Sequence, residues 1–429
     1  MIFKKANRLS GEITVPGDKS ITHRAVMLGA IATGKTEIHN FLYGEDCLST
    51  IDCFEKLGVQ VEFSSDPKGI VTIHGVGLHG LQAPSTSLDV GNSGTTIRLM
   101  SGILAGQEFD SVLTGDGSIQ RRPMLRIIEP LSMMGADISS TLGNNCAPLQ
   151  IKGKLLNGIH YISPYNSAQV KSAVLFAGLF ADSRTSVTEK NTSRNHSELM
   201  IDYFGGELYM EDTTITVCPE PTLVGQRVVV PGDISSAAYF IAAALIVPNS
   251  EILIKNVGIN PTRDGMIRVV KDMGGHIDIL NERFDGEPFA DLLVKSSTLH
   301  GVTIEGAIVP TLIDELPIIS VLAAYADGQT VIRDAAELRV KESDRLEAIV
   351  DNLSSMEVDI TPTPDGMIIN GGKPVKGTVI GSRLDHRIAM SFAIAALGAE
   401  GNTEIIGSEC VKISYPGFYQ ALESLIQKN

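Results

Sequence analysis

The sequence predicts an α/β protein of two domains, each containing three copies of one unit, and three observations lead to this prediction. The chain has 429 residues, enough for two or three domains at roughly 100–200 residues each. Six segments follow one plan, in which a polar capping residue leads into an Ala-rich helix, a short turn and a strand. The tetrapeptide VPGD occurs at residues 15–18 and again at 230–233, near the start of two of these segments.

The six segments succeed one another along the whole chain. In order they read ITVPGDKSITHRAVMLGAIATGKTEIHNF, VGNSGTTIRLMSGILAGQEFDSVLTG, YNSAQVKSAVLFAGLFADSRTSVTE, VVVPGDISSAAYFIAAALIVPNSEILIKNV, TLIDELPIISVLAAYADGQTVIRDA and RLDHRIAMSFAIAALGAEGNTEIIGS. Because VPGD is repeated, we expect the chain to cross between domains at both places. This predicts one domain over residues 19–231 and a second over residues 1–18 and 232–429, with the functional site in the cleft between them.

Residues 29–36, GAIATGKT, match the P-loop pattern G-x-x-x-x-G-K-[ST]. The preceding SITHRAVMLGAIA predicts a helix and the following TEIHNF predicts a strand, which is the reverse of the P-loop order. A phosphate would then face a helix C-terminus, the unfavourable end of the dipole. The corresponding turns ADSRTSV and ADGQTVI in other units indicate that Lys35 belongs to an ordinary helix-to-strand turn. We therefore do not interpret the match as a nucleotide site.

A second match, GVGLHG at residues 75–80, fits the dinucleotide-binding pattern G-x-G-x-x-G. It follows the strand-like IVTIH, but the pattern requires a helix directly after the glycines. Pro84 lies where that helix would run. We therefore do not interpret this match as a dinucleotide-binding site either.

The bulk composition is that of an ordinary globular protein with 43% hydrophobic residues and a net charge of −15, which argues against a nucleic-acid or anionic-membrane surface. The five cysteines form no C-x-x-C pair, which favours a reducing compartment. The N-terminus MIFKKANRLSGEITV has no apolar leader, and the apolar stretch AAYFIAAALIVP is shorter than the ~20 residues of a membrane span. We expect a cytoplasmic monomer with no nucleic-acid or membrane partner.

Capping residues stand at the start of every Ala-rich helix. They are Asp18, Ser20, Asn92, Ser93, Asn166, Ser167, Asp233, Ser235, Asp314 and Asp385. If the units pack alike, three helix N-termini converge in each domain and form an anion-binding region. Cations lie at or just after the same helix starts, namely Lys19, Arg24, Arg98, Lys341, Arg345 and Arg387. Because positive side chains on positive helix ends are costly, this pattern predicts a bound polyanion.

Several cationic motifs closely resemble those of the 5-enolpyruvylshikimate-3-phosphate synthases. They are PGDKSITHRA, GNSGTTIR, LTGDGSIQRRP, NSAQVKSA, RVKESDRL, DHRIAM and CVKISYPGF, in the order of the family and over almost the whole chain. The resemblance implies a two-domain inside-out α/β barrel with three βαβαββ units in each domain. It also implies the shikimate pathway of aromatic amino acid (chorismate) biosynthesis, and the target of the inhibitor glyphosate.

The resemblance implies two sets of binding residues. The phosphate of phosphoenolpyruvate would contact Lys19, Gly94, Arg122, Gln169 and Lys412, and its carboxylate Arg345 and Arg387. Shikimate 3-phosphate would contact Lys19, Ser20, Arg24, Ser167, Ala168, Gln169, Ser193, Arg194, Asp314 and Lys341. Arginine suits the carboxylate because its planar guanidinium binds carboxylates through two parallel hydrogen bonds.

The implied reaction adds the 5-hydroxyl of shikimate 3-phosphate to C2 of phosphoenolpyruvate and then expels phosphate from a tetrahedral intermediate. It needs a base for the hydroxyl and a group that moves a proton at the methylene carbon. Asp314 is the candidate base, and Lys19 and Glu342 are candidates for the methylene. No metal or cofactor is required, because fixed cations take that role. From the pattern alone, residues 341–345 could instead form a solvated helix face in which Glu342 pairs with Arg345.

The sequence departs from the family at three places. Ala168 follows Ser167 where some members have a second serine. The segment TSRNHSE lacks the tyrosine of other members, which favours Arg194 over His196 as the substrate-binding residue. Leu99 follows Arg98 where other members often have proline. Two alternatives stay open: a UDP-N-acetylglucosamine enolpyruvyl transferase, although LTGDGSIQRRP lacks the cysteine typical of that group, and a non-catalytic phospho-sugar binding protein.

Overall fold

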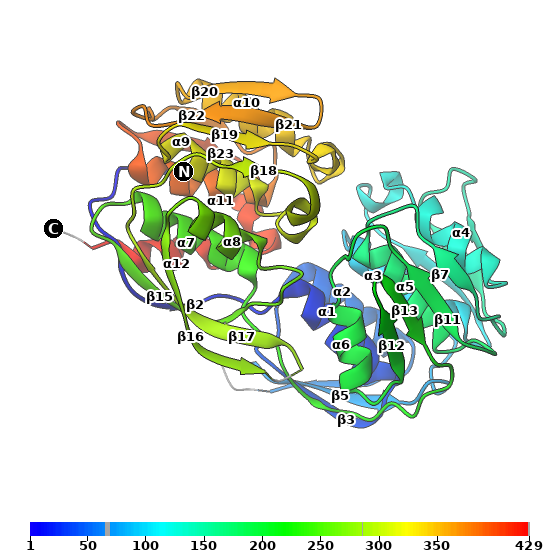
Figure 1. Ribbon diagram of the computed structural model, residues 1–429. Helices are drawn as coiled ribbons and strands as arrows, with labels where there is room; N and C mark the ends of the chain where they lie inside the picture. The colour runs from blue at the N-terminus through cyan, green and yellow to red at the C-terminus, as the bar shows by residue number, and fades with distance from the viewer. Residues whose placement is uncertain (65–68, 285, 428–429) are drawn as a thin grey trace. The chain divides into compact units, whose positions relative to one another are not determined.

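The computed structural model describes residues 1–64, 69–284 and 286–427, and it is a mixed α/β structure (Figure 1). The chain forms two compact units. The 17–230 unit comprises Gly17–Val230 and a short segment that includes Glu287. The 231–427 unit comprises Met1–Pro16, Pro231–Phe284 and the chain from Pro288 onward.

The 17–230 unit alternates helices and strands along the chain. Its elements are α1 (Lys19–Ile31), β3 (Thr33–His39), α2 (Glu45–Lys56), β4 (Gln60–Phe63), β5 (Val71–Val76), β6 (Leu88–Asp89), α3 (Gly94–Ala105), β7 (Asp110–Thr114), the 3₁₀ helix η1 (Ile119–Arg121), α4 (Leu125–Met133), β8 (Asp137–Ser140), β9 (Leu149–Lys152), β10 (His160–Ile162), α5 (Ala168–Gly178), β11 (Thr185–Thr188), α6 (His196–Tyr203), β12 (Leu208–Glu211), β13 (Thr214–Val217) and β14 (Arg227–Val229).

The 231–427 unit follows the same alternation. Its elements are β1 (Ile2–Phe3), β2 (Ser10–Thr14), α7 (Ile234–Ile246), β15 (Glu251–Gly258), α8 (Gly265–Asp272), β16 (His276–Phe284), β17 (Pro288–Lys295), β18 (Thr303–Ile304), the 3₁₀ helix η2 (Gly306–Thr311), α9 (Leu316–Tyr325), β19 (Gln329–Ile332), η3 (Ala336–Val340), α10 (Arg345–Ser355), β20 (Asp359–Thr363), β21 (Gly366–Asn370), β22 (Val379–Gly381), α11 (His386–Gly398), β23 (Thr403–Ile406), η4 (Ser408–Ile413) and α12 (Phe418–Leu425).

The four-stranded sheets share one topology. In the sheet β6-β7-β9-β8, β6 and β7 are parallel and the other neighbours are antiparallel. The sheets β10-β11-β13-β12 and β18-β19-β21-β20 repeat this order. A parallel pair requires a crossover, and in each of these sheets a helix supplies it: α3, α5 or α9.

Two strands are exchanged between otherwise similar sheets. β2 precedes α1 in sequence but pairs in parallel with β15, whereas β14 precedes α7 but pairs in parallel with β3. The chain therefore passes from one unit to the other after each of these strands, at the two VPGD segments.

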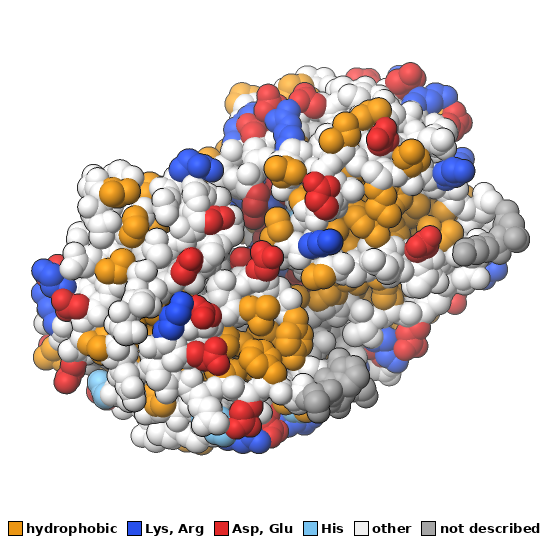
Figure 2. Space-filling view, turned by 180° about the vertical axis from the view of Figure 1, so that it is seen from behind, with side chains coloured by type: hydrophobic (Ala, Val, Ile, Leu, Met, Phe, Trp, Pro, Cys, Tyr) orange, Lys and Arg blue, Asp and Glu red, His pale blue; other side chains and the backbone are white. Residues whose placement is uncertain are grey.

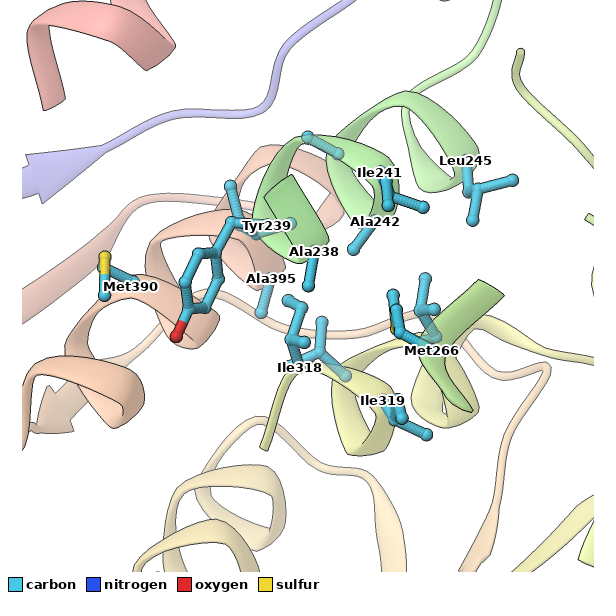
Figure 3. Packing of buried hydrophobic residues seen from close by; sticks show 14 of the residues in the cluster. Ala238, Tyr239, Ile241, Ala242, Leu245, Met266, Ile318, Ile319, Met390 and Ala395 are labelled. Atoms are coloured by element: carbon cyan, nitrogen blue, oxygen red, sulfur yellow. The ribbon is translucent and has the colours of Figure 1, made fainter. Parts of the chain in front are cut away.

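The crossover helices form the centre of each unit. Nearly every residue of α7, α9 and α11 is buried, and Figure 3 shows Ala238, Ile318 and Ala395 of these three helices packed together. Such helices are apolar on all sides because all sides face protein. In contrast, α8 and α10 expose polar residues on one side and bury the other. The 17–230 unit shows the same contrast, between its buried helices α1, α3 and α5 and the outer helix α2.

The structure confirms the helix-to-strand order around the P-loop match but corrects the turn. Helix α1 ends at Ile31 and β3 already begins at Thr33, so Lys35 lies within a strand and not in a turn. Its ammonium pairs with Glu37 two residues along the strand, and both side chains are exposed. The second match likewise has no helix after it: the described chain after Val76 consists of turns and irregular backbone up to β6.

On the face drawn in Figure 2, basic and acidic side chains are interspersed. Exposed ion pairs of the described chain include Lys56 with Asp52 and Arg383 with Glu347. Among the described helices, none combines the length and the apolar character that crossing a membrane requires.

Candidate functional site

The predicted site residues fall into two groups, one in each unit. The first group lies at the N-termini of α1, α3 and α5, where capping residues end the preceding loops. The Asp18 carboxylate accepts a hydrogen bond from the Ile21 amide at 3.0 Å, and the Ser93 hydroxyl accepts one from the Thr96 amide at 3.1 Å. Ser167 is the N-cap of α5, but its hydroxyl makes no capping bond. The three helix starts thus present amides and side chains together.

Lys19, the first residue of α1, pairs with the carboxylate of Asp46 in α2. Burial raises the pKa of Asp46, but the ammonium of Lys19 outweighs it and the pKa lies below its usual value. The charge of Arg122 acts in the same direction, and its guanidinium donates to the Asn92 side chain at 2.7 Å. Nothing in the sequence pattern linked Asp46 to Lys19, because it lies on a different helix.

Two guanidinium groups approach the backbone closely at Gly94. A Cβ at this position would lie 2.9 Å from Arg98 Nη1 and 3.2 Å from Arg122 Nη1. Arg98 donates to Gln169 Oε1 at 2.6 Å, and Gln169 Nε2 donates to the Thr95 hydroxyl at 3.1 Å. These bonds join the first turns of α3 and α5, so Gly94, Arg122 and Gln169 lie in one polar region.

Arg24 ties α1 to α5 and α6. Its guanidinium donates to the Ser20 carbonyl at 3.0 Å, to the Ser172 hydroxyl at 2.8 Å and to the Ser197 hydroxyl at 2.6 Å. Burial lowers the pKa of Arg24 to about 10, so it remains a cation. The charge of Arg194 also lowers this pKa, which places that second guanidinium within electrostatic range.

The second group centres on Asp314 in the 231–427 unit. Its carboxylate lies 3.6 Å from Lys341 Nζ and 3.5 Å from Arg345 Nη1, and its carbonyl accepts from Arg387 at 3.3 Å. Arg345 also contacts Glu342 at 2.5 Å and Asp385 at 2.8 Å. The predicted pairing of Glu342 with Arg345 is present, but Arg345 is buried, so this segment is not a solvated helix face.

Several pKa values in this second group are shifted. Desolvation raises the pKa of Glu342, but the positive charge of Arg345, assisted by that of Arg387, outweighs it and holds the carboxyl well below its usual range. Burial and the charge of Arg387 lower the pKa of His386 to about 4. Burial opposes the charge of Arg387, but Asp314 outweighs burial and raises its pKa. At neutral pH, Glu342 is therefore an anion and Arg387 a cation.

The structure corrects the expectation that Asp314 starts a helix. Asp314 does not cap a helix: α9 begins at Leu316 with Glu315 as its N-cap. The two acidic residues are adjacent, and helix α9 starts one residue later than the sequence pattern indicated. Lys412 lies exposed in η4, and within the described residues no ion pair joins it to the cluster around Asp314.

Ser193 and Arg194 lie in the segment between β11 and α6, and Ala168 is the first residue of α5. The hydroxyl of Ser193 is buried without a hydrogen-bond partner among the described residues. His196 is buried and pairs with Glu287 at 2.7 Å, which gives it a structural partner. In the described part of the chain, no three His, Cys, Asp or Glu side chains come close enough to hold a metal ion.

A buried chain of polar groups supports the start of α3. His23 Nδ1 lies 2.8 Å from the Thr50 hydroxyl, which lies 2.7 Å from that of Thr96, and Thr96 donates to the Ser93 cap at 2.6 Å. Burial, assisted by the charge of Lys19, lowers the pKa of His23 to about 3. His23 is therefore neutral in the folded protein across the physiological range.

We expect stability to fall in acid partly through His23. Between about pH 6.5 and pH 3 the unfolded chain binds a proton at this residue that the folded chain does not, so unfolding becomes easier as pH falls. Replacing His23 with Asn should reduce the pH dependence of the unfolding free energy by about 1.4 kcal/mol per pH unit between about pH 4 and 6. Urea unfolding of both proteins across this range measures the difference, and parallel curves would contradict the assignment.

The chain matches the family model described as EPSP synthase (3-phosphoshikimate 1-carboxyvinyltransferase) over residues 3–422. It is 55% identical over 423 residues to a 3-phosphoshikimate 1-carboxyvinyltransferase of Thermoanaerobacter sp. (strain X514), covering 98% of this chain and 99% of the relative. It is 53% identical over 425 residues to the protein of the same name from Brevibacillus brevis, covering 99% of both chains.

A solved structure of EPSP synthase from Acinetobacter baumannii is similar throughout. It superposes with a TM-score of 0.91 at 47% sequence identity, covering 99% of this chain and 97% of the other.

Proposed function

The chain belongs to the EPSP synthase family, and we propose that the two groups of cations described above bind the phosphates and carboxylates of that family's substrates. The enzyme transfers the enolpyruvyl group of phosphoenolpyruvate to the 5-hydroxyl of shikimate 3-phosphate and releases phosphate. Nothing in the comparisons supports a UDP-N-acetylglucosamine enolpyruvyl transferase. The observation that carries the residue assignment is the placement of cations at helix starts: Lys19 begins α1, Arg345 begins α10 and Arg387 lies in the first turn of α11.

The charges of the substrates explain why so many cations are needed. Phosphoenolpyruvate and shikimate 3-phosphate together carry two phosphates and two carboxylates, or about five negative charges near neutral pH. Two like unit charges 4 Å apart repel by about 4 kcal/mol at an effective dielectric constant of 20. Binding both anions side by side therefore requires cations close to each of them, assisted by helix N-termini.

We assign phosphoenolpyruvate to residues from both groups. Lys19, Arg122 and Gln169 would bind its phosphate near the backbone of Gly94, where a side chain would collide with the guanidinium groups. Arg345 and Arg387 would bind its carboxylate. Lys412 completes the set implied by the resemblance, and the exposed side chain would have to reach the phosphate from η4.

Shikimate 3-phosphate would be bound by the hydroxyls and cations around Arg24. The proposed contacts are Lys19, Ser20, Arg24, Ser167, Ala168, Gln169, Ser193, Arg194, Asp314 and Lys341. Two structural features support this set. The Ser193 hydroxyl is buried and unpartnered, and Arg24 is held by three hydrogen bonds, so that it is preorganised for an anion.

The protonation states divide the proton transfers among three residues. Asp314 would accept the proton of the 5-hydroxyl as its oxygen attacks C2 of phosphoenolpyruvate. Glu342, a carboxylate at neutral pH, would accept the methyl proton as phosphate leaves. Lys19, a cation paired with Asp46, suits donation of the proton that first converts the methylene to the methyl group.

We also propose a finer description of the fold and location. Each unit would be an inside-out α/β barrel of three βαβαββ units, supported by the buried crossover helices and the shared sheet topology. A cytoplasmic location is supported by the five cysteines, which form no disulfide.

The test is phosphate release on mixing the protein with phosphoenolpyruvate and shikimate 3-phosphate, with shikimate 3-phosphate omitted as the control. We expect release only when both substrates are present. Binding of shikimate 3-phosphate without phosphate release would indicate a phospho-sugar binding protein, and release with UDP-N-acetylglucosamine as acceptor would indicate the other transferase.

A further inference from the structure

A buried cluster of three charged side chains lies next to the segment that carries Ser193 and Arg194. Lys171 of α5 is completely enclosed, with 0% of its side chain exposed. Its ammonium lies 2.8 Å from Glu189 Oε2 and 2.7 Å from Glu198 Oε1, and it donates to the Ser193 carbonyl at 3.4 Å. A lysine has three N–H donors, and each of them has an acceptor here.

The three acceptors mark the beginning, middle and end of one segment. Glu189 directly follows β11, Ser193 lies in the irregular stretch after it, and Glu198 lies in the first turn of α6. Glu189 also accepts a hydrogen bond from the Ser193 amide at 3.1 Å. Both backbone polar groups of Ser193 are therefore held by the cluster. Residues 189–195, all of them described by the structure, form no strand or helix. The Asn191 amide donates to Asn166 Oδ1 at 3.3 Å, and the cluster holds the backbone of Ser193.

Charged rather than apolar side chains occupy this buried cluster, and their energetic cost indicates a specific role. Taking an ammonium and two carboxylates out of water is expensive, and well-packed apolar side chains often stabilise a protein at least as much. Apolar side chains cannot, however, hold a backbone amide and carbonyl in one position. Arg24 brings a second positive charge to the same place: Glu198 raises its pKa, and its guanidinium binds Ser197 of α6. Two cations and two carboxylates thus anchor the start of α6 to α5 and α1.

We propose that Lys171, together with Glu189 and Glu198, positions Ser193 and Arg194 for binding shikimate 3-phosphate. The role rests on the proposed function, which assigns Ser193 and Arg194 to that substrate. Lys171 is a positioning residue: it is enclosed by protein and acts through the backbone of Ser193. The helix that carries Ala168 and Gln169 at its start therefore also holds the backbone of Ser193, through Lys171 one turn further on.

The test is Lys171→Met, which keeps an unbranched apolar side chain as far as Cε and removes the ammonium. Since displacement of binding groups by about 1 Å can cost up to 10²-fold, we expect the Kd for shikimate 3-phosphate, measured by calorimetry, to rise at least tenfold. The KM for phosphoenolpyruvate and kcat at saturating shikimate 3-phosphate should change less than about threefold. A merely structural role would lower the melting temperature and the active fraction without changing that Kd.

Two further variants keep the test decisive. Lys152→Met removes an exposed lysine that pairs with Asp137 in the same unit and should change none of these values. Glu189→Gln keeps the side-chain shape and serves if Lys171→Met does not fold; it should raise the Kd for shikimate 3-phosphate by about threefold to tenfold. A folded Lys171→Met or Glu189→Gln protein with wild-type affinity would overturn the proposal.

Arg194→Ala separates this proposal from the residue assignment on which it rests. If Arg194→Ala weakens binding and the folded Lys171 and Glu189 variants do not, the positioning role is wrong and the assignment stands. If Arg194→Ala also binds shikimate 3-phosphate normally, the assignment itself is wrong and the positioning role falls with it.

Discussion

Replacing Lys19 with alanine should lower kcat/KM by about 10²–10⁴-fold, because it removes charge-assisted hydrogen bonds to both substrates worth about 1.5–3 kcal/mol each. The structure adds a second reason. Lys19 neutralises the buried carboxylate of Asp46, and without the ammonium this anion would face the incoming phosphates. Steady-state phosphate release measures the effect.

Two controls accompany this variant. Lys35→Ala removes a lysine of the P-loop match whose ammonium pairs with exposed Glu37 on the same strand, and it should leave turnover and the urea midpoint unchanged. Lys19→Ala/Asp46→Asn removes the uncompensated anion as well and should recover part of the lost affinity. If Lys35→Ala were inactive and the wild-type protein bound ATP, the interpretation of the P-loop match would be wrong. A fully active Lys19→Ala protein would show that Lys19 does not belong to the site.

The local elements around Lys19 could be predicted from sequence because short-range patterns determine them. The stretch SITHRAVMLGAIA, with recurring apolar residues and no turn signal, predicts α1, and the alternating TEIHNF predicts β3; both are confirmed. The position of Lys35 was predicted wrongly because the turn is very short: a single residue, Ala32, separates the helix from the strand. A pattern of helix-terminating residues does not show how few of them the turn uses.

The cations of the site could be predicted for a different reason. Lys19 and Arg387 closely follow capping aspartates, so these helix starts are visible in the sequence, as Arg387 after Asp385 illustrates. Their partners could not be predicted. Asp46, Glu189 and Glu198 reach Lys19 and Lys171 from helices and loops separated in sequence, and nothing in an isolated acidic residue indicates which cation it meets. Packing of the units determines these pairs.

Asp314→Asn should lower turnover at least about a hundredfold, the low end of the usual contribution of a general base. Asparagine keeps the size of the side chain and most of its hydrogen bonding but does not accept a proton at neutral pH. Because Glu315 and not Asp314 is the N-cap of α9, this substitution does not remove a cap. A loss of turnover therefore cannot be attributed to fraying of the helix.

The surrounding charges indicate that the variant will fold and bind. Asp314 lies near Lys341 and Arg345, but Arg345 keeps Glu342 and Asp385 as partners, so the buried guanidinium remains compensated. Removing one carboxylate also makes the region more positive. We therefore expect Asp314→Asn to bind shikimate 3-phosphate with unchanged or higher affinity while its turnover falls.

Asp344→Asn is the matched control for this substitution. Asp344 caps α10, accepting from the Glu347 amide at 3.0 Å, and pairs with Arg339 at 3.0 Å. Asparagine is an equally good cap, so this variant should keep near-normal turnover. Calorimetric binding and phosphate-release kinetics on the same preparations distinguish the possible roles of Asp314. Normal turnover of Asp314→Asn would reduce the carboxylate to a partner of Lys341 and Arg345, and equal losses of affinity and rate would make it a positioning residue. Only retained affinity with lost turnover identifies Asp314 as the base, because that combination places its contribution in the transition state alone.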